Sequence, residues 1–213
     1  MRSNRRSANR LAGTLAVDHP ICSGLHHHDD ANDQVMAELT RLLSARTAIV
    51  GVGNAEHGDD AFGPALARRL RRLGLTAALD AGTCPENYLG AVVALQPQLV
   101  LILDAAEIDR PPGTLMLCDP RDLAAAGLSC HAGSLALLAR YLRGMTDADC
   151  RLLLVQPKQS VALPDNLDRD GRARVPFSSL SPPVRAAALS VCRTILTALK
   201  NKQAAPAAIP HVS

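Results

Sequence analysis

The sequence predicts a single three-layer α/β/α domain built on a mostly parallel, twisted sheet of about five strands. From residue 36 onward, short apolar runs alternate with amphipathic segments of helical period, the pattern of repeated strand–helix units. One run, Leu99–Leu103, is apolar at every position, as expected of a strand that is buried on both faces of a parallel sheet. A chain of 213 residues is long enough for one such domain with tails.

Each predicted element has a local reason. The first strand, 47–52, is rich in small and β-branched apolar residues, and the helix over 60–73 carries an apolar stripe and stops before a glycine. The second strand, 77–79, precedes a helix over 86–95 that a proline opens. The remaining elements are strands over 99–103, 114–118 and 151–155 and helices over 121–126, 134–142 and 182–199, the last capped by Ser181.

The folded domain is predicted to span residues 36–200, between disordered tails at 1–35 and 201–213. The N-terminal segment is rich in Arg, Ser, His and Asp and shows no apolar period. Its histidine run, residues 26–28, could hold a metal weakly, although a solvated polar tract is the favoured interpretation. Met36, where the patterning begins, could serve as the start of the translated chain.

The composition argues against nucleic-acid and membrane partners. Much of the net charge of +3 comes from the first ten residues, and later charges are interspersed, so no basic face is expected. Aromatic residues make up 2%, too few for base stacking. No segment reaches the roughly 18 apolar residues that span a bilayer. The apolar stretch 11–17 lacks a small-residue cleavage site, so export is not expected.

The cysteines indicate a reducing compartment. None of the six forms a C-x-x-C pair or a zinc-finger spacing, and three lie inside apolar runs, where cysteine behaves as a small hydrophobic residue. We therefore expect no disulfide framework and a cytoplasmic protein. We also expect a monomer.

Acidic residues follow three predicted strands and are expected to meet at one edge of the sheet. The first strand ends in a glycine turn that delivers Asn54 and then two adjacent acids, Asp59 and Asp60, into the start of a helix. Two further strands end at Asp80 and Asp104. Because ligands of open parallel sheets bind outside the carboxyl ends of the strands, these groups should converge there.

Structural roles remain open for some of these residues. Asp59 could cap its own helix, and Asp80, before Ala-Gly-Thr, could simply form a turn. An acid at the end of a buried strand is costly unless it is paired or bound to a metal, which favours a functional Asp104. His131 stands in a polar break before a helix. Two carboxylates and one imidazole would form an open site for a divalent metal, to which His57 could add a fourth contact.

Motifs of several other enzyme classes are absent. There is no G-x-S-x-G, H-E-x-x-H or Walker A sequence. The stretch 49–54 resembles the start of a dinucleotide fingerprint, but Glu56 stands where the third glycine belongs, which argues against a nucleotide-dependent enzyme. Cys130 is an unfavourable thiol nucleophile, because adjacent residues such as His131 rarely orient toward each other as nucleophile and base.

These motifs resemble those of the hydrogenase maturation endopeptidases, which process the large subunit of nickel–iron hydrogenases. The matching pieces, in the family's order, are Gly51–Asn54, Gly58–Asp60 with Gly63, Asp80–Thr83 with Pro85–Asn87, Leu101–Ala105, Pro112–Thr114 and His131. The resemblance covers about residues 47–157 and the last helix. Several separated motifs in the right order make it specific.

The resemblance implies an endopeptidase that removes the C-terminal extension of a hydrogenase large-subunit precursor after nickel insertion. By motif, Asp60, Asp104 and His131 match the family's metal-contacting positions, which are thought to recognise the nickel of the substrate. Asp80 matches an aspartate associated with activity, which could act as general base. At this point the metal could either polarise the scissile carbonyl or only dock the substrate.

Departures from the family pattern concern the substrate more than the reaction. Ala81 replaces a frequent glycine, Glu56 and His57 occupy a loop that is often apolar, and the segment 162–179 looks like an insertion. The alternative function is a non-enzymatic nickel-binding maturation chaperone on the same fold. Such a carrier would use the same three ligands but would not need Asp80.

Overall fold

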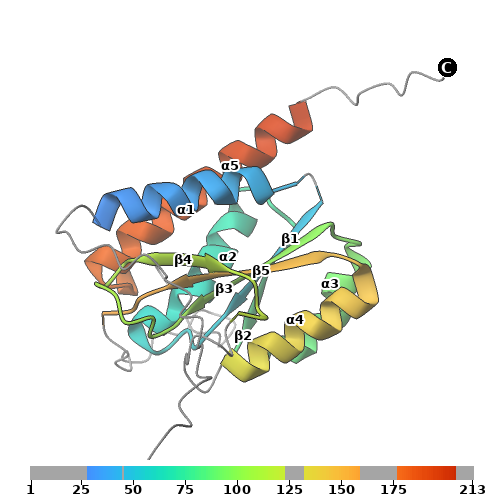
Figure 1. The fold of residues 1–213 in the computed structure, drawn as a ribbon, viewed down its shortest axis with the longest axis horizontal. Coiled ribbons are helices and arrows are strands. Elements are labelled where there is room, and N and C mark those ends of the chain that lie inside the picture. Colours follow the sequence, from blue (N-terminus) through green and yellow to red (C-terminus); the bar gives the residue numbers. More distant parts are fainter. Residues whose placement is uncertain (1–27, 45, 123–131, 159–176, 205–213) are drawn as a thin grey trace, which may run out of the picture.

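The computed structural model describes residues 28–44, 46–122, 132–158 and 177–204. Its five-stranded sheet carries helices on both faces (Figure 1). The strands are β1 (Thr47–Val52), β2 (Ala78–Gly82), β3 (Leu99–Ala105), β4 (Leu115–Cys118) and β5 (Asp149–Val155). The α-helices are α1 (His28–Leu42), α2 (Phe62–Arg72), α3 (Leu89–Ala94), α4 (Ala132–Thr146) and α5 (Pro182–Ala204). Short 3-10 turns are η1 (Gly58–Ala61), η2 (Pro85–Tyr88) and η3 (Phe177–Ser179).

The strand order β2-β1-β3-β5-β4 places β3 at the centre of the sheet. β1 pairs in parallel with β2 and β3, and β3 pairs in parallel with β5. Only the edge strand β4 runs antiparallel, beside β5, within the described sheet. The carboxyl ends of four strands therefore share one edge, where ligands bind in such folds. The predicted fold class is confirmed.

The two faces of β3 belong to different cores. Leu101 and Leu103 lie in the core under α1, α2 and α5, whereas Val100 and Ile102 lie in the core under α3 and α4 (Figure 1). All four side chains are inaccessible to solvent, which explains why β3 is apolar at every one of these positions. Burial of each contributes about 1.5–3 kcal/mol to the free energy of folding.

Two glycines allow α2 to begin close against the sheet. A Cβ atom on Gly63 would lie 2.3 Å from the carbonyl oxygen of Val52 and 2.4 Å from that of Leu103. A Cβ atom on Gly51 would lie 2.2 Å from the carbonyl oxygen of Gly63. This close approach holds η1, and the acids that it carries, directly over the carboxyl ends of β1 and β3.

The structure extends the folded region beyond both predicted boundaries. α1 begins at His28, so residues 28–35, expected in the tail, are helical, and α5 continues to Ala204. Leu39 and Leu43, in the second half of α1 and just after it, are buried in the core. The first half of α1 is polar, which is why no apolar period marked it.

Several predicted features fall wholly or mostly outside the described residues. They are residues 26 and 27 of the histidine run, residues 123–126 of the helix expected over 121–126, His131 and Cys130, residues 162–176 of the apparent insertion and residues 205–213 of the C-terminal tail. The described start of the expected helix, residues 121 and 122, is a turn. The helix expected over 86–95 is divided into η2 and α3.

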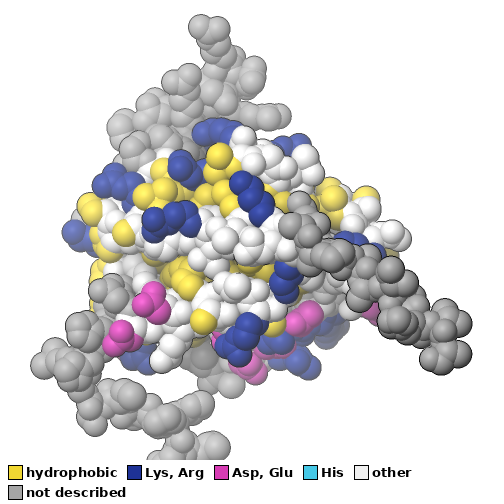
Figure 2. All heavy atoms as spheres, turned by 90° about the horizontal axis from the view of Figure 1, so that it is seen from above, with side chains coloured by type: hydrophobic (Ala, Val, Ile, Leu, Met, Phe, Trp, Pro, Cys, Tyr) yellow, Lys and Arg dark blue, Asp and Glu magenta, His cyan; other side chains and the backbone are white. Residues whose placement is uncertain are grey.

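None of the helices in the described ranges is long and apolar enough to cross a membrane. The face formed by α1 and α5 is seen in Figure 2, where Lys and Arg side chains are spread among apolar and polar ones rather than gathered into one patch. That distribution agrees with the interspersed charges of the sequence.

Candidate active site

A closed loop after β1 fixes Asp60 at the carboxyl edge of the sheet. The backbone N–H of Asn54 donates to Oδ2 of Asp60 at 2.7 Å, and the Asn54 side-chain oxygen accepts the N–H of Glu56 at 2.9 Å. The N–H of Asp60 in turn donates to the carbonyl of His57 at 3.0 Å. Gly53 has φ +129° and lies so close that a Cβ there would approach the Asp60 carbonyl oxygen to 2.1 Å. Only glycine allows this loop to close on Asp60.

Asp104 lies beside Asp60 and is almost completely buried. Its side chain is 5% exposed, and its Oδ1 accepts the N–H of Ala105 at 2.9 Å. Burial, with a further contribution from the negative charge of Asp60, raises the pKa of Asp104 from 3.8 to about 8. The two predicted ligands therefore lie close enough to interact electrostatically, and near neutral pH Asp104 retains a proton that a bound cation could replace.

The third predicted ligand, His131, lies outside the described residues, so its position stays a prediction. Its neighbour Ala132 begins α4, and two residues separate the end of α4 from the start of β5. Asp104 pairs in register with Leu154, which belongs to the core under α3 and α4. Asp104 thus occupies the sheet face that α4 covers. Within the described ranges, no group of three His, Cys, Asp or Glu side chains is arranged to hold a metal ion.

Asp80 lies on the other face of the sheet. It stands in register with Gly51, which is in turn paired with Leu103, and all three positions face the α2 side. Its carboxylate forms an ion pair with Arg68 of α2, and its Oδ1 accepts the N–H of Gly82 at 3.2 Å. The structure therefore brings Asp60 and Asp104 together but ties Asp80 to α2. The role of Asp80 as general base stays a prediction.

Asp59 does not cap its own helix, contrary to one of the two roles considered for it. The N-cap residue of η1 makes no side-chain capping bond, and the carboxylate of Asp59, a residue that is 1% exposed, binds residues distant in sequence instead. It accepts the N–H and the hydroxyl of Ser181, each at 2.7 Å, and the N–H of Lys158 at 2.8 Å. Ser181 precedes α5 as predicted, and its carbonyl accepts the N–H of Arg185. These partners are 99 and 122 residues away in sequence, so no local signal could identify them.

Gln156 is a second residue at this edge that sequence reasoning missed. Its Oε1 accepts the N–H of Ile108 at 2.8 Å and of Arg110 at 3.3 Å, and its Nε2 donates to Glu107 at 2.6 Å. The side chain is 5% exposed and orders the loop that follows Asp104. The sequence does carry a signal for Gln156, because this polar residue directly follows the apolar end of β5, just as Asp104 follows an apolar run in β3.

His57, considered as a fourth metal contact, is half-buried in the loop between Asn54 and η1. Its carbonyl accepts the N–H of Asp60, so its described role in the loop is carried by the backbone. A metal contact from its imidazole stays untested.

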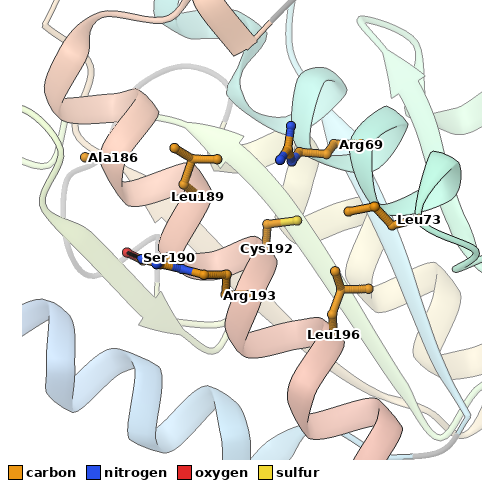
Figure 3. Close-up of a pocket in the computed structure, with 8 residues that line it drawn as sticks. All are labelled: Arg69, Leu73, Ala186, Leu189, Ser190, Cys192, Arg193 and Leu196. Atoms are coloured by element: carbon orange, nitrogen blue, oxygen red, sulfur yellow. Dashed lines mark hydrogen bonds between the residues drawn. The ribbon is translucent and has the colours of Figure 1, made fainter.

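A separate groove of about 380 Å³ lies between α2 and α5. Figure 3 shows Arg69 of α2 and Leu73, which directly follows α2, facing residues of α5 that include Leu189 and Cys192. Burial raises the pKa of the Cys192 thiol and keeps it protonated, which makes it a poor nucleophile. None of the predicted site residues lines this groove, so it is distinct from the edge site.

The fold and the edge site define a class, a small α/β/α protein with a buried aspartate, Asp104, near a second one, Asp60, at the carboxyl edge of its sheet. Solved structures of endopeptidases share this fold. The crystal structure of a [NiFe] hydrogenase maturation protease, HycI from Thermococcus kodakarensis, aligns with a TM-score of 0.63 and 30% identity over 77% of this chain and 99% of that one. The solution structure of the endopeptidase HycI from Escherichia coli aligns with a TM-score of 0.55 and 25% identity over 71% and 88%.

The sequence comparisons agree. The family model described as hydrogenase maturation protease matches residues 63–168. The Hydrogenase 3 maturation protease of Escherichia coli K12 is 39% identical over 75 residues, which are 34% of this chain and 48% of that protein, so this match spans about half of its length. The chain belongs to the hydrogenase maturation protease family and is a peptidase, as its motifs predicted.

Proposed function

We propose that this protein is a cytoplasmic, monomeric endopeptidase that removes the C-terminal extension of a nickel–iron hydrogenase large-subunit precursor after nickel insertion. Asp60, Asp104 and His131 would contact the nickel held by the substrate. The observation that carries this proposal is the juxtaposition of Asp60 with the buried Asp104 at the carboxyl edge of a maturation-protease fold.

The donor chemistry suits recognition of a metal that belongs to the substrate. Two carboxylates and an imidazole form a borderline-hard set that accepts a divalent cation and leaves coordination positions for ligands of the partner. A nickel ion would offset the repulsion between Asp60 and Asp104 and displace the proton of Asp104. A precursor without nickel offers no such compensation, so cleavage would follow only after the metal has been inserted.

Asp80 is proposed as the general base, held by Arg68 in the middle of β2. A positioned carboxylate that removes a proton from water contributes about 10²–10⁴-fold to such a reaction. In that case the metal docks and orients the scissile bond. If Asp80 is instead only structural, the metal itself must polarise the carbonyl.

The rival function, a nickel-binding chaperone, finds less support, because the relatives that share this fold are named as proteases and endopeptidases. Catalytic turnover separates the two functions. A peptidase converts many precursor molecules per enzyme molecule, whereas a carrier releases no peptide.

The test is intact-mass spectrometry of a cognate large-subunit precursor incubated with this protein, either nickel-loaded or nickel-free. We expect loss of a C-terminal peptide only from the nickel-loaded precursor, and no loss with the Asp104→Asn or His131→Ala variant. Cleavage that survives both substitutions would remove the three-ligand site. Comparison of Asp80→Asn with Arg68→Gln isolates the base, because both break the ion pair but only the former removes the carboxylate.

A further inference from the structure

We infer that Asp59 is a positioning residue, whose buried carboxylate ties the loop that carries Asp60 to β5 and α5 and so holds Asp60 against Asp104. This inference rests on the proposed function for its consequence in catalysis. The carboxylate of Asp59 itself is bound to Ser181 and Lys158, and so it would act on the metal only through its neighbour.

The contacts of Asp59 join three parts of the chain at one point. Oδ1 accepts the N–H of Ser181, and Oδ2 accepts both the hydroxyl of Ser181 and the N–H of Lys158. Ser181 immediately precedes α5, and Lys158 follows the end of β5. Hydrogen bonds from neutral donors to a buried carboxylate are among the stronger ones in proteins, so this junction is stiff.

Stiffness at Asp59 passes directly to Asp60. Consecutive Cα atoms are about 3.8 Å apart, and both residues belong to the same 3-10 turn. On its other side, Asp60 accepts the N–H of Asn54 at its Oδ2. The backbone of Gly53 also packs so closely against the Asp60 carbonyl that a Cβ atom on Gly53 would not fit. The Asp60 carboxylate therefore sits between two fixed points, and loosening Asp59 releases one of them. Groups that orient a metal ligand in this way typically change metal affinity about 10–100-fold when removed.

The Asp59→Asn variant tests this with little change in shape. In the wild type both carboxylate oxygens of Asp59 accept hydrogen bonds, whereas an asparagine has only one oxygen acceptor. The NH₂ group of the asparagine, itself a donor, must therefore face a donor of Ser181 or Lys158. The turn must then shift to separate the two donors. We expect the Asn54 N–H, which reports on the Asp60 carboxylate, to lose at least about tenfold of its protection from hydrogen exchange.

The matched control is Thr47→Val at the opposite, amino end of β1. Thr47 is 3% exposed, and its hydroxyl donates to the carbonyl of Ser44 at 2.7 Å and accepts the Ser44 N–H at 3.0 Å. This variant also loses buried hydrogen bonds and stability, but far from the edge site. It should leave the exchange of the Asn54 N–H, corrected for global stability, at the wild-type rate.

Both variants and the wild type are then titrated with Ni²⁺ by calorimetry as full-length proteins. Loss of Asn54 protection together with at least tenfold weaker nickel binding in Asp59→Asn, and neither change in Thr47→Val, would support the inference. Asn54 protection in Asp59→Asn equal to that in Thr47→Val would overturn it. A third outcome would separate the inference from the proposed function. If Asp59→Asn loses protection at Asn54 but the wild type neither binds nickel nor cleaves precursor, the positioning of Asp60 is upheld and the proposed function is refuted.

Discussion

At the scale of single residues, Asp104 makes the metal-free protein sensitive to pH. Its pKa is raised from 3.8 to about 8 by burial and by the neighbouring charge of Asp60. Between these two values the unfolded chain has lost the Asp104 proton while the folded protein still holds it. The folded state therefore binds more protons, and its stability falls as the pH rises through this window. Above about pH 8 the folded protein carries an ionised, buried carboxylate without compensation.

The Asp104→Asn variant should remove this dependence. Its amide is neutral at every pH, so in the presence of a chelator the variant should be more stable than the wild type at pH 8, and the difference should shrink as the pH falls toward 4. Urea unfolding at several pH values measures both curves. Substitution of the exposed Glu38 by Gln serves as a control for the loss of a carboxylate elsewhere. Parallel curves for the wild type and Asp104→Asn would contradict the buried, protonated state of Asp104.

The residues of the site differ in how far the sequence could reveal them. Asp60 and Asp104 were predicted to meet because each comes after an apolar run, and the carboxyl ends of such runs share one edge of a parallel sheet. The separation of Asp80 from Asp104 was not predicted, because it depends on which face of the sheet each side chain takes. Asp59 could be seen as an acid near a helix start, but its partners come from the far end of the chain.

At the scale of elements, the approach of α2 to the sheet depends on a helix residue without a side chain. Gly63→Ala would place a Cβ within 2.4 Å of two carbonyl oxygens, one from β1 and one from β3. Because both acceptors are backbone atoms of central strands, neither can move without disturbing the sheet. We expect this substitution to destabilise the protein by about 3 kcal/mol and to displace the Asp60 loop.

Gly144→Ala in α4 is the matched control. A Cβ at that position meets no atom within 4 Å, so alanine should stabilise the helix by about 0.5–1 kcal/mol. Denaturant unfolding of the two variants measures both effects. Equal stability for Gly63→Ala and the wild type would show that α2 does not need its close approach.

The elements themselves were predictable to different degrees for physical reasons. β1 and β3 were placed closely because a strand buried on both faces reads as an uninterrupted apolar run. The antiparallel direction of β4 was not predicted, since a short strand of this kind has the same sequence pattern in either orientation. Its antiparallel course is set by the turn before it, where the Gly113 N–H donates to the Gln156 carbonyl.

At the scale of the whole molecule, α1 is part of the domain rather than of a tail. It lies along α5 on the outer face of the sheet (Figure 1), and Leu39 enters the main core. Asn32 also ties α1 to the edge strand, because its Nδ2 donates to the Gly113 carbonyl at 3.2 Å and its Oδ1 accepts the Leu115 N–H at 2.8 Å. An edge strand with such a cover presents fewer free backbone groups to other chains.

A chain that begins at Met36 would lack Asn32 and should therefore be less stable than the full chain. Asn32→Ala isolates the side chain and should lower the free energy of unfolding by about 1–2 kcal/mol, because the Leu115 N–H and Gly113 carbonyl lose their partners. Hydrogen exchange at Leu115 reports the local effect. Asn32→Asp keeps the acceptor for Leu115 and should preserve that protection while losing the bond to Gly113. The prediction would be contradicted if the chain from Met36 and the full chain had the same free energy of unfolding and the same exchange rate at the Leu115 N–H. The turns of α1 before Met36 would then contribute nothing to stability.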